Sequence, residues 1–355
     1  MKTKLIKSGV LLAGVSTMAA GAQAQDSGSW TDRIGLGYRA ALNISAKFSG
    51  LGGYNSLNTP GVAGVTPATA APGTIVRTYD DGFIGVDISQ NASSLTTYWG
   101  YNNSSQVVNG AIQMHSSSSS ATASSGDVGN NDLRNGIELG YFQPLGGKHD
   151  WCWGVEGALN WTPISLRDSR PLAGDVVTLT HAFEFVGLTA PVAPPNYVGP
   201  VDGPGAPLLG TTAADLGTTT QTGAATIAGT RSIEANLFGL RLGPYLEYDF
   251  SRTVSVDLGG GFSGGLLDSK FSYNDLVTIS GLGSQASSGT DHSLGFVYGG
   301  YVRGQVTFKL GKSAALFGGA ELDSLNDFTQ STGGTHAQIN LGTIISVTGG
   351  IRLSF

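Results

Sequence analysis

The stretch RIGLGYRAALNISAKF, from Arg33 to Phe48, alternates between two kinds of side chain. Its even-numbered positions are almost all apolar, beginning with Ile34 and ending with Phe48, whereas Arg33, Arg39 and Lys47 occupy odd-numbered positions. A period of two residues is typical of an extended strand, in which successive side chains point to opposite faces. The stretch therefore predicts a strand with one apolar face and one charged face.

The same alternation recurs seven more times along the chain. It is found at 135–145, 151–161, 238–250, 254–266, 294–310, 314–323 and 339–355. Tight turns join the second segment to the third, the fourth to the fifth and the sixth to the seventh. Longer connections cover 50–131, 169–230, 274–292 and 325–335. Alternating short and long connections predict an up-and-down antiparallel barrel with the long loops at one end.

The first residues and the composition narrow the class of protein. A secretory signal peptide is predicted at 1–24, because three lysines precede an apolar run from Ser8 to Ala20 and an A-x-A site follows at Ala22–Ala24. The barrel is predicted at 25–355. Charged residues make up 12% of the chain, against about 25% in typical soluble domains. The single cysteine allows no intramolecular disulfide, and a net charge of −6 gives no basic surface for nucleic acid.

The volume of the apolar faces decides which side of the barrel they line. An eight-stranded barrel has an interior just wide enough to be filled by side chains, so several dozen large apolar groups must point outward. Such a surface requires lipid as its solvent. We therefore predict an all-β, eight-stranded transmembrane barrel with membrane lipid as its partner. Two aromatic girdles are expected, one at the short-turn end (Tyr141, Trp151, Trp153, Tyr248, Phe250, Phe308, Phe355) and one at the long-loop end (Phe48, Trp161, Phe271, Tyr273, Phe296, Tyr298).

These eight segments resemble the small bacterial outer-membrane β-barrel family, the OmpA-, OmpX- and OmpW-like group. The most specific feature is the end of the chain, where Ile351, Leu353 and Phe355 look like the C-terminal signal read by the barrel-assembly machinery of Gram-negative bacteria. The resemblance implies a location in the bacterial outer membrane and that machinery as a partner. The connections at 50–131 and 169–230 are long for this group.

The charged faces of the predicted strands carry both signs in similar numbers. The expected lumen network consists of Arg33, Arg39, Lys47, Glu138, Glu156, Arg241, Glu247, Asp257, Arg303, Glu321 and Arg352. Charges in a narrow interior must be paired and hydrogen-bonded, so we expect a filled or narrow lumen. A selective pore would instead show a ring of one sign.

Four further segments, 74–88, 94–102, 110–115 and 175–187, also resemble strands. In the barrel wall they would enlarge it to ten or twelve strands, and a barrel of that size could conduct. They carry polar residues on both faces, so we predict hairpins above the membrane.

The histidines give the sequence its candidates for catalysis. Asp291 beside His292 could mimic the acid and base of a barrel protease, and a loop histidine such as His181, together with a Ser and an Asp, could mimic a lipid acyltransferase. Neither spacing is specific, so no catalytic residue, metal site or cofactor is predicted. The favoured hypothesis is a non-enzymatic protein with an envelope-structural or surface-interaction role and an unknown surface ligand. A porin-like channel and a lipid-modifying enzyme or protease are the alternatives.

Overall fold

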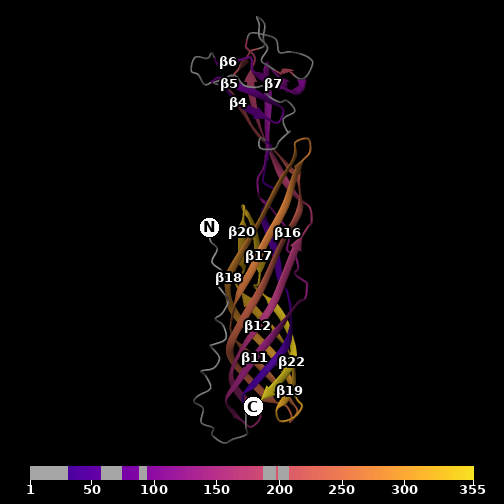
Figure 1. Ribbon diagram of the computed structural model, residues 1–355, viewed down its shortest axis with the longest axis vertical. Coiled ribbons are helices and arrows are strands. Elements are labelled where there is room, and N and C mark those ends of the chain that lie inside the picture. The colour runs from indigo at the N-terminus through magenta and orange to yellow at the C-terminus, as the bar shows by residue number, and fades with distance from the viewer. Residues whose placement is uncertain (1–30, 57–73, 88–93, 187–196, 199–207) are drawn as a thin grey trace, which may run out of the picture.

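The computed structural model describes residues 31–56, 74–87, 94–186, 197–198 and 208–355, and these residues form an all-β protein (Figure 1). The predicted signal peptide lies outside the described residues. Their one helical element with assigned bounds is the 3₁₀ turn η2, Ser104–Gln106. Among the described residues, no helix is long and apolar enough to span a membrane.

Eight antiparallel strands form a closed ring. They are β1 (Arg33–Leu42), β11 (Arg134–Lys148), β12 (Trp151–Asp168), β16 (Ala214–Asp249), β17 (Val254–Ile279), β18 (Gly283–Lys309), β19 (Ala314–Leu325) and β22 (Ile344–Ser354). Each pairs with the next, and β1 closes the ring against β22, with Arg33 opposite Ser354. The predicted eight-stranded antiparallel barrel is confirmed.

The remaining strands lie outside the ring. They are β2 (Ser45–Leu51), β3 (Tyr54–Asn55), β4 (Thr74–Tyr79), β5 (Gly82–Asp87), β6 (Leu95–Thr96), β7 (Trp99–Tyr101), β8 (Val107–Val108), β9 (Ala111–Ser119), β10 (Ala123–Ser124), β13 (Leu172–Glu184), β14 (Tyr197–Val198), β15 (Leu209–Gly210), β20 (Phe328–Thr332) and β21 (Thr335–Asn340). None of them widens the described ring. The described residues of the predicted segments 74–88 and 94–102 contain β4–β7, at the opposite end of the long axis from β19 and β22 (Figure 1).

Several ring strands continue far beyond the predicted barrel. The region 169–230, predicted as a loop, contains β13 and the first part of β16, and 274–292 is a continuous hairpin of β17 and β18. Strand β12 ends at Asp168 and β13 begins at Leu172. Both strands pair with β16, β12 along the C-terminal part of β16 and β13 along its N-terminal part. Strands β13 and β9 then pair with each other and lead to the distal sheet, which we call the head.

The head has its own apolar core. It consists of the buried side chains Tyr79, Ile84, Trp99, Tyr101, Ile112, Met114, Phe183 and Leu209. These side chains come from β4, β5, β7, β9, β13 and β15, which are distant in sequence. The long loops therefore build a folded unit of their own.

Large apolar side chains cover the outside of the ring. Leu36 is 60% exposed, Trp153 53%, Leu242 55% and Val302 65%. From Trp151 to Trp161 strand β12 advances about 33 Å at ~3.3 Å per residue, which at a tilt of about 40° gives a height of about 25 Å. An outer-membrane barrel needs an apolar band of about 25 Å. We call this outward apolar surface the belt.

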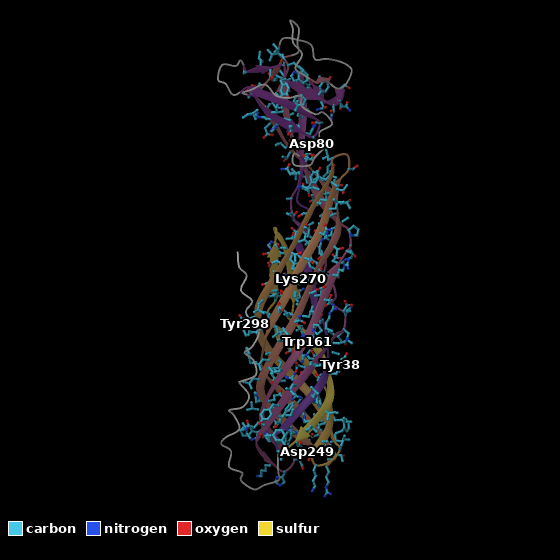
Figure 2. The ribbon with its side chains drawn as sticks, in the orientation of Figure 1. Tyr38, Asp80, Trp161, Asp249, Lys270 and Tyr298 are labelled. Carbon is cyan, nitrogen blue, oxygen red and sulfur yellow. The ribbon has the colours of Figure 1, made fainter. Side chains whose placement is uncertain are left out.

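The aromatic residues predicted for the girdle at the short-turn end are all exposed or half-exposed, so they point outward as predicted. At the other edge of the belt Trp161, Phe296 and Tyr298 are also outward, and Tyr38 joins them (Figure 2). Phe48, Phe271 and Tyr273 are not in this girdle. All three are buried inside the barrel.

The position of Phe48 follows from a break in the first predicted strand. Asn43 has a φ of 66°, in the left-handed region that ends regular strand geometry. Beyond it the inward positions change from odd to even, so Ile44 and Phe48 point inward and Lys47 is exposed. The prediction of Lys47 in the lumen is wrong for this reason. Strand 339–355 likewise breaks between β21 and β22, which turns Ile339 and Leu341 inward.

Phe271 and Tyr273 are inward because β17 runs without such a break. Its odd-numbered residues face the lumen from Asp257 through Leu267 to Ile279. Above the belt the chemistry of the two faces is reversed: inward residues become apolar, and outward residues such as Asp268 and Lys270 are charged. Along the same strands the outward surface therefore changes from apolar within the belt to polar and charged above it.

Inward glycines make room for large side chains in the narrow lumen. A Cβ added at Gly37 would lie 3.0 Å from the ring of Phe317, and one at Gly35 3.3 Å from it. Contacts this short require the ring to move. The high glycine content is explained in part by this pairing of small and large inward residues.

Candidate functional site: the filled lumen

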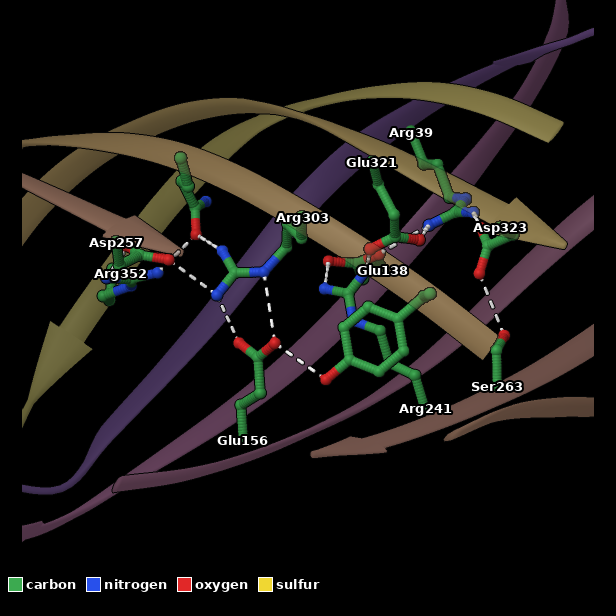
Figure 3. A network of polar contacts seen from close by, with 12 residues as sticks. Arg39, Glu138, Glu156, Arg241, Asp257, Ser263, Arg303, Glu321, Asp323 and Arg352 are labelled. Atoms are coloured by element: carbon green, nitrogen blue, oxygen red, sulfur yellow. Dashed lines mark hydrogen bonds and ion pairs between the residues drawn. The ribbon is translucent and has the colours of Figure 1, made fainter. Parts of the chain in front are cut away.

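The lumen within the belt contains a network of buried ion pairs (Figure 3). Toward the long-loop end Arg39 contacts three carboxylates, with Nη1 3.1 Å from Glu138 and 2.5 Å from Glu321, and Nη2 2.6 Å from Asp323. Arg241 pairs with Glu138 at 2.5 Å and also with Glu321. All five side chains are buried, so the group behaves as a single unit.

A second group follows toward the short-turn end. Arg303 pairs with Glu156 and, at 2.6 Å, with Asp257. Arg352 lies 3.5 Å from Asp257 and donates to Gln305 at 2.7 Å. The hydroxyl of Tyr301 donates to Glu156 at 2.8 Å.

The last pair of the network lies at the short-turn mouth, where Arg33 contacts Glu247 at 2.6 Å. Ten of the eleven predicted lumen residues are thus buried and ion-paired, in two groups and one separate pair, and Lys47 is the exception. Each of the eight ring strands contributes at least one charged member. The network therefore joins the wall from inside in addition to blocking the lumen.

Four inward aromatic rings complete this filling, and the sequence interpretation did not assign them a role. They are Phe142, Tyr245, Tyr301 and Phe317, all nine-tenths or more buried. The guanidinium of Arg352 lies 4.1 Å from the ring centre of Phe142, and that of Arg241 lies 5.5 Å from Tyr301. Such contacts stabilise a cation that has lost its water. Phe142 is four residues from Glu138, so in a regular strand the two side chains lie on the same face. This spacing was the signal in the sequence that could have placed Phe142 in the lumen.

An apolar cluster continues the filling above the ion pairs. Its buried members include Ile44, Phe48, Leu51, Ile164, Leu166, Ile233, Leu237, Leu267, Phe271, Val297, Ile339 and Leu341. A cavity of about 20 Å³ lies where the cluster meets Arg39 and Asp323. This volume suffices for about one water molecule. From the short-turn end toward the long-loop end, the described lumen is therefore filled by ion-paired side chains and then by apolar side chains.

The histidines do not assemble the predicted pairs. Asp291 and His292 are neighbours in β18, so their side chains leave opposite faces, and Asp291 instead accepts a hydrogen bond from Gln330 at 3.0 Å. His181 Nδ1 lies 3.1 Å from the hydroxyl of Tyr79.

One Asp–His pair does form, in the head, between residues that the sequence did not connect. His115 Nδ1 lies 2.6 Å from Asp81 Oδ2, and the His115 backbone N–H donates to the other oxygen at 2.9 Å. The hydrogen bond from Asp81 raises the pKa of His115. This pair ties β9 to the β4–β5 turn, and the described residues show no cluster of His, Cys, Asp and Glu suited to a metal ion.

Ile351, Leu353 and Phe355, the residues of the predicted C-terminal signal, point outward, and they are 54%, 53% and 67% exposed.

No protein-family model and no curated protein matches the chain. Among solved structures the chain is similar to Ail, the attachment invasion locus protein of Yersinia pestis, at 9% identity and a TM-score of 0.24, over 91% of this chain and 99% of that one.

It is also similar to the outer membrane protease OmpT from Escherichia coli, at 10% identity and a TM-score of 0.32, over 92% and 96% of the two chains. The ring of eight antiparallel strands, which the predicted resemblance to small outer-membrane barrels implies, is shown by the strand pairing of this structure.

Proposed function

We propose that the protein is an integral outer-membrane barrel without enzymatic activity, which holds its head outside the cell for structural or surface-interaction purposes. The observation that carries this proposal is the ion-pair network, to which all eight strands contribute. Buried pairs of this kind fix the wall and leave little room for solute, which disfavours the porin-like alternative. The separate core of the head supports display of a folded surface.

Cysteine labelling on intact cells tests the proposed orientation and location. Ser105 is exposed in the head and Ser251 is exposed in a short turn, whereas the native Cys152 is buried. A membrane-impermeant maleimide should label Ser105→Cys on intact cells and Ser251→Cys only after the outer membrane is permeabilised. Labelling of both variants on intact cells, or of neither, would contradict the proposal.

The enzymatic alternative has a separate test. The Asp81–His115 pair has acid–base geometry, but the pair also connects two strands of the head. If the purified protein cleaves peptides or lipids, His115→Gln, His181→Ala and His292→Ala should leave that activity unchanged, because none of these residues has a role in the proposed function. Loss of a reproducible activity in one of them would contradict the proposal.

A further inference from the structure

The short-turn mouth of the barrel contains a pocket of about 450 Å³, which is within the range of small-molecule sites. Its polar lining consists of Thr31, Arg33, Thr307, Lys309, Lys312, Arg352 and Ser354, and no carboxylate lines it. Four cationic residues thus meet around one opening. We propose that this pocket binds a small anionic ligand through a phosphate or carboxylate group.

Three of the cations that line the pocket are paired with carboxylates that lie outside its lining. Arg33 is paired with Glu247 at 2.6 Å, Arg352 with Asp257 at 3.5 Å and Lys309 with Asp249 at 2.7 Å. None of these three carboxylates is part of the pocket wall, so the pairs present their positive ends to the opening. Lys312 adds a cation in the exposed turn, with no carboxylate paired to it among the described residues. The lining cations would therefore attract an oxyanion in the pocket, because their paired carboxylates lie farther from it than the cations do.

Two buried arginines supply the second observation. The side chain of Arg352 is 1% exposed and that of Arg33 is 9% exposed. The Nε–H of each has no hydrogen-bond acceptor within the described part of the chain. Buried guanidinium groups normally satisfy their donors. Arginine is well suited to recognise phosphate and carboxylate, and both of these arginines line the pocket.

The remaining surface of the pocket fits a polar ligand. The hydroxyl groups of Thr31 and Ser354 can donate to an oxyanion, while Thr307 accepts from Arg352 at 3.1 Å. Apart from Thr31, the residues that line the pocket come from β1, β18, β19 and β22 and from the turn between β18 and β19. Strands β19 and β22 are labelled at the end of the barrel opposite the head (Figure 1). If the proposed orientation holds, its ligand comes from the periplasm, either as a free phosphate compound or as a carboxylate of the cell wall.

Calorimetric titration of the full chain in a neutral detergent at low ionic strength tests the proposal. Inorganic phosphate and acetate serve as separate probes, with sodium chloride at matched ionic strength as the blank. Saturable binding of phosphate alone would support a phosphate ligand, and saturable binding of acetate would support a carboxylate source. Lys312→Gln should weaken binding about fivefold, the effect of one charge near the surface of a site. Lys309→Gln/Lys312→Gln should weaken it further.

Lys148→Gln is the matched control, because Lys148 is an exposed lysine at the same end of the barrel that does not line the pocket. It should bind both probes as the unchanged protein does. Absence of saturable binding to either probe, or an equal loss in Lys148→Gln and Lys312→Gln, would overturn the proposal. Heat-modifiable migration checks that each variant is folded. Because binding is measured in detergent, its failure would leave the proposed surface role unaffected.

Discussion

Glu156 of β12 and Arg303 of β18 form an ion pair across the lumen, although neither strand is a neighbour of the other in the ring. A contact of this kind can form only inside the barrel. Arg39 of β1 reaches Glu321 of β19 in the same way, past β22. The charges that the sequence placed on one face of each strand therefore act between opposite walls.

Removal of one member of such a pair should be costly. Glu156→Leu leaves Arg303 with one paired carboxylate, Asp257, and removes the acceptor of Tyr301. We therefore expect a loss of about 3 kcal/mol in the free energy of unfolding, as for other broken buried pairs. Urea unfolding in lipid vesicles measures this loss. Lys309→Gln is the control, since the Lys309–Asp249 pair is partly exposed and should cost less than about 1 kcal/mol. Equal effects in the two variants would mean that Glu156 is not buried as described.

The height of the belt gives a second prediction, for two outward positions of β16. Leu242 lies within the belt and is 55% exposed, whereas Ala228 lies above it. Leu242→Arg should lower the free energy of unfolding in bilayers by about 2–4 kcal/mol, and Ala228→Arg by about 0–1 kcal/mol, because the cost of a charge falls with distance from the membrane centre. A larger loss for Ala228→Arg than for Leu242→Arg would mean that the membrane does not surround the belt.

The head should lose stability as the pH rises. Because Asp81 raises the pKa of His115, the folded head holds the proton more tightly than the unfolded chain does. The resulting stabilisation is complete below the ordinary pKa of about 6.5 and is lost as the pH rises through the raised pKa. Hydrogen exchange of β9 amides, corrected for the intrinsic effect of pH, measures the change.

Two substitutions define the origin of this pH dependence. Asp81→Asn should remove most of it, because Asp81 supplies the hydrogen bond that is the largest cause of the raised pKa. His149→Gln, in a turn at the other end of the barrel, should leave it unchanged. The neighbouring Asp80 has a pKa raised by burial, and its charge makes a smaller contribution to the raised pKa of His115. A head that becomes more stable between pH 6.5 and pH 8.5 would contradict the assignment.

The assembly signal at the end of the chain remains a prediction. Deletion of Phe355 should reduce the amount of heat-modifiable barrel in the membrane while synthesis and export continue. Phe250→Ala removes another exposed aromatic residue from the same girdle, so it separates loss of the signal from loss of a lipid contact. Normal insertion after deletion of Phe355 would count against recognition by the barrel-assembly machinery.

The ring was predictable because eight segments show a period of two with apolar faces too large to be enclosed. The reversal of polarity above the belt was partly readable too, since Leu267, Phe271 and Tyr273 have the numbering parity of the lumen residue Asp257. The break at Asn43 was not predictable, because it depends on a local positive φ that most sequences of this pattern do not require. The head depends on pairing between distant strands such as β7 and β14, which alternation does not specify.

Single-channel recording of the purified protein in planar bilayers tests the central claim most directly, since a lumen filled by ion pairs and apolar side chains should not conduct. We predict a bilayer without stable openings, at both polarities and in high salt, under conditions where heat-modifiable migration confirms a folded barrel. Steady openings of nanosiemens size would contradict the filled lumen and favour a porin-like channel.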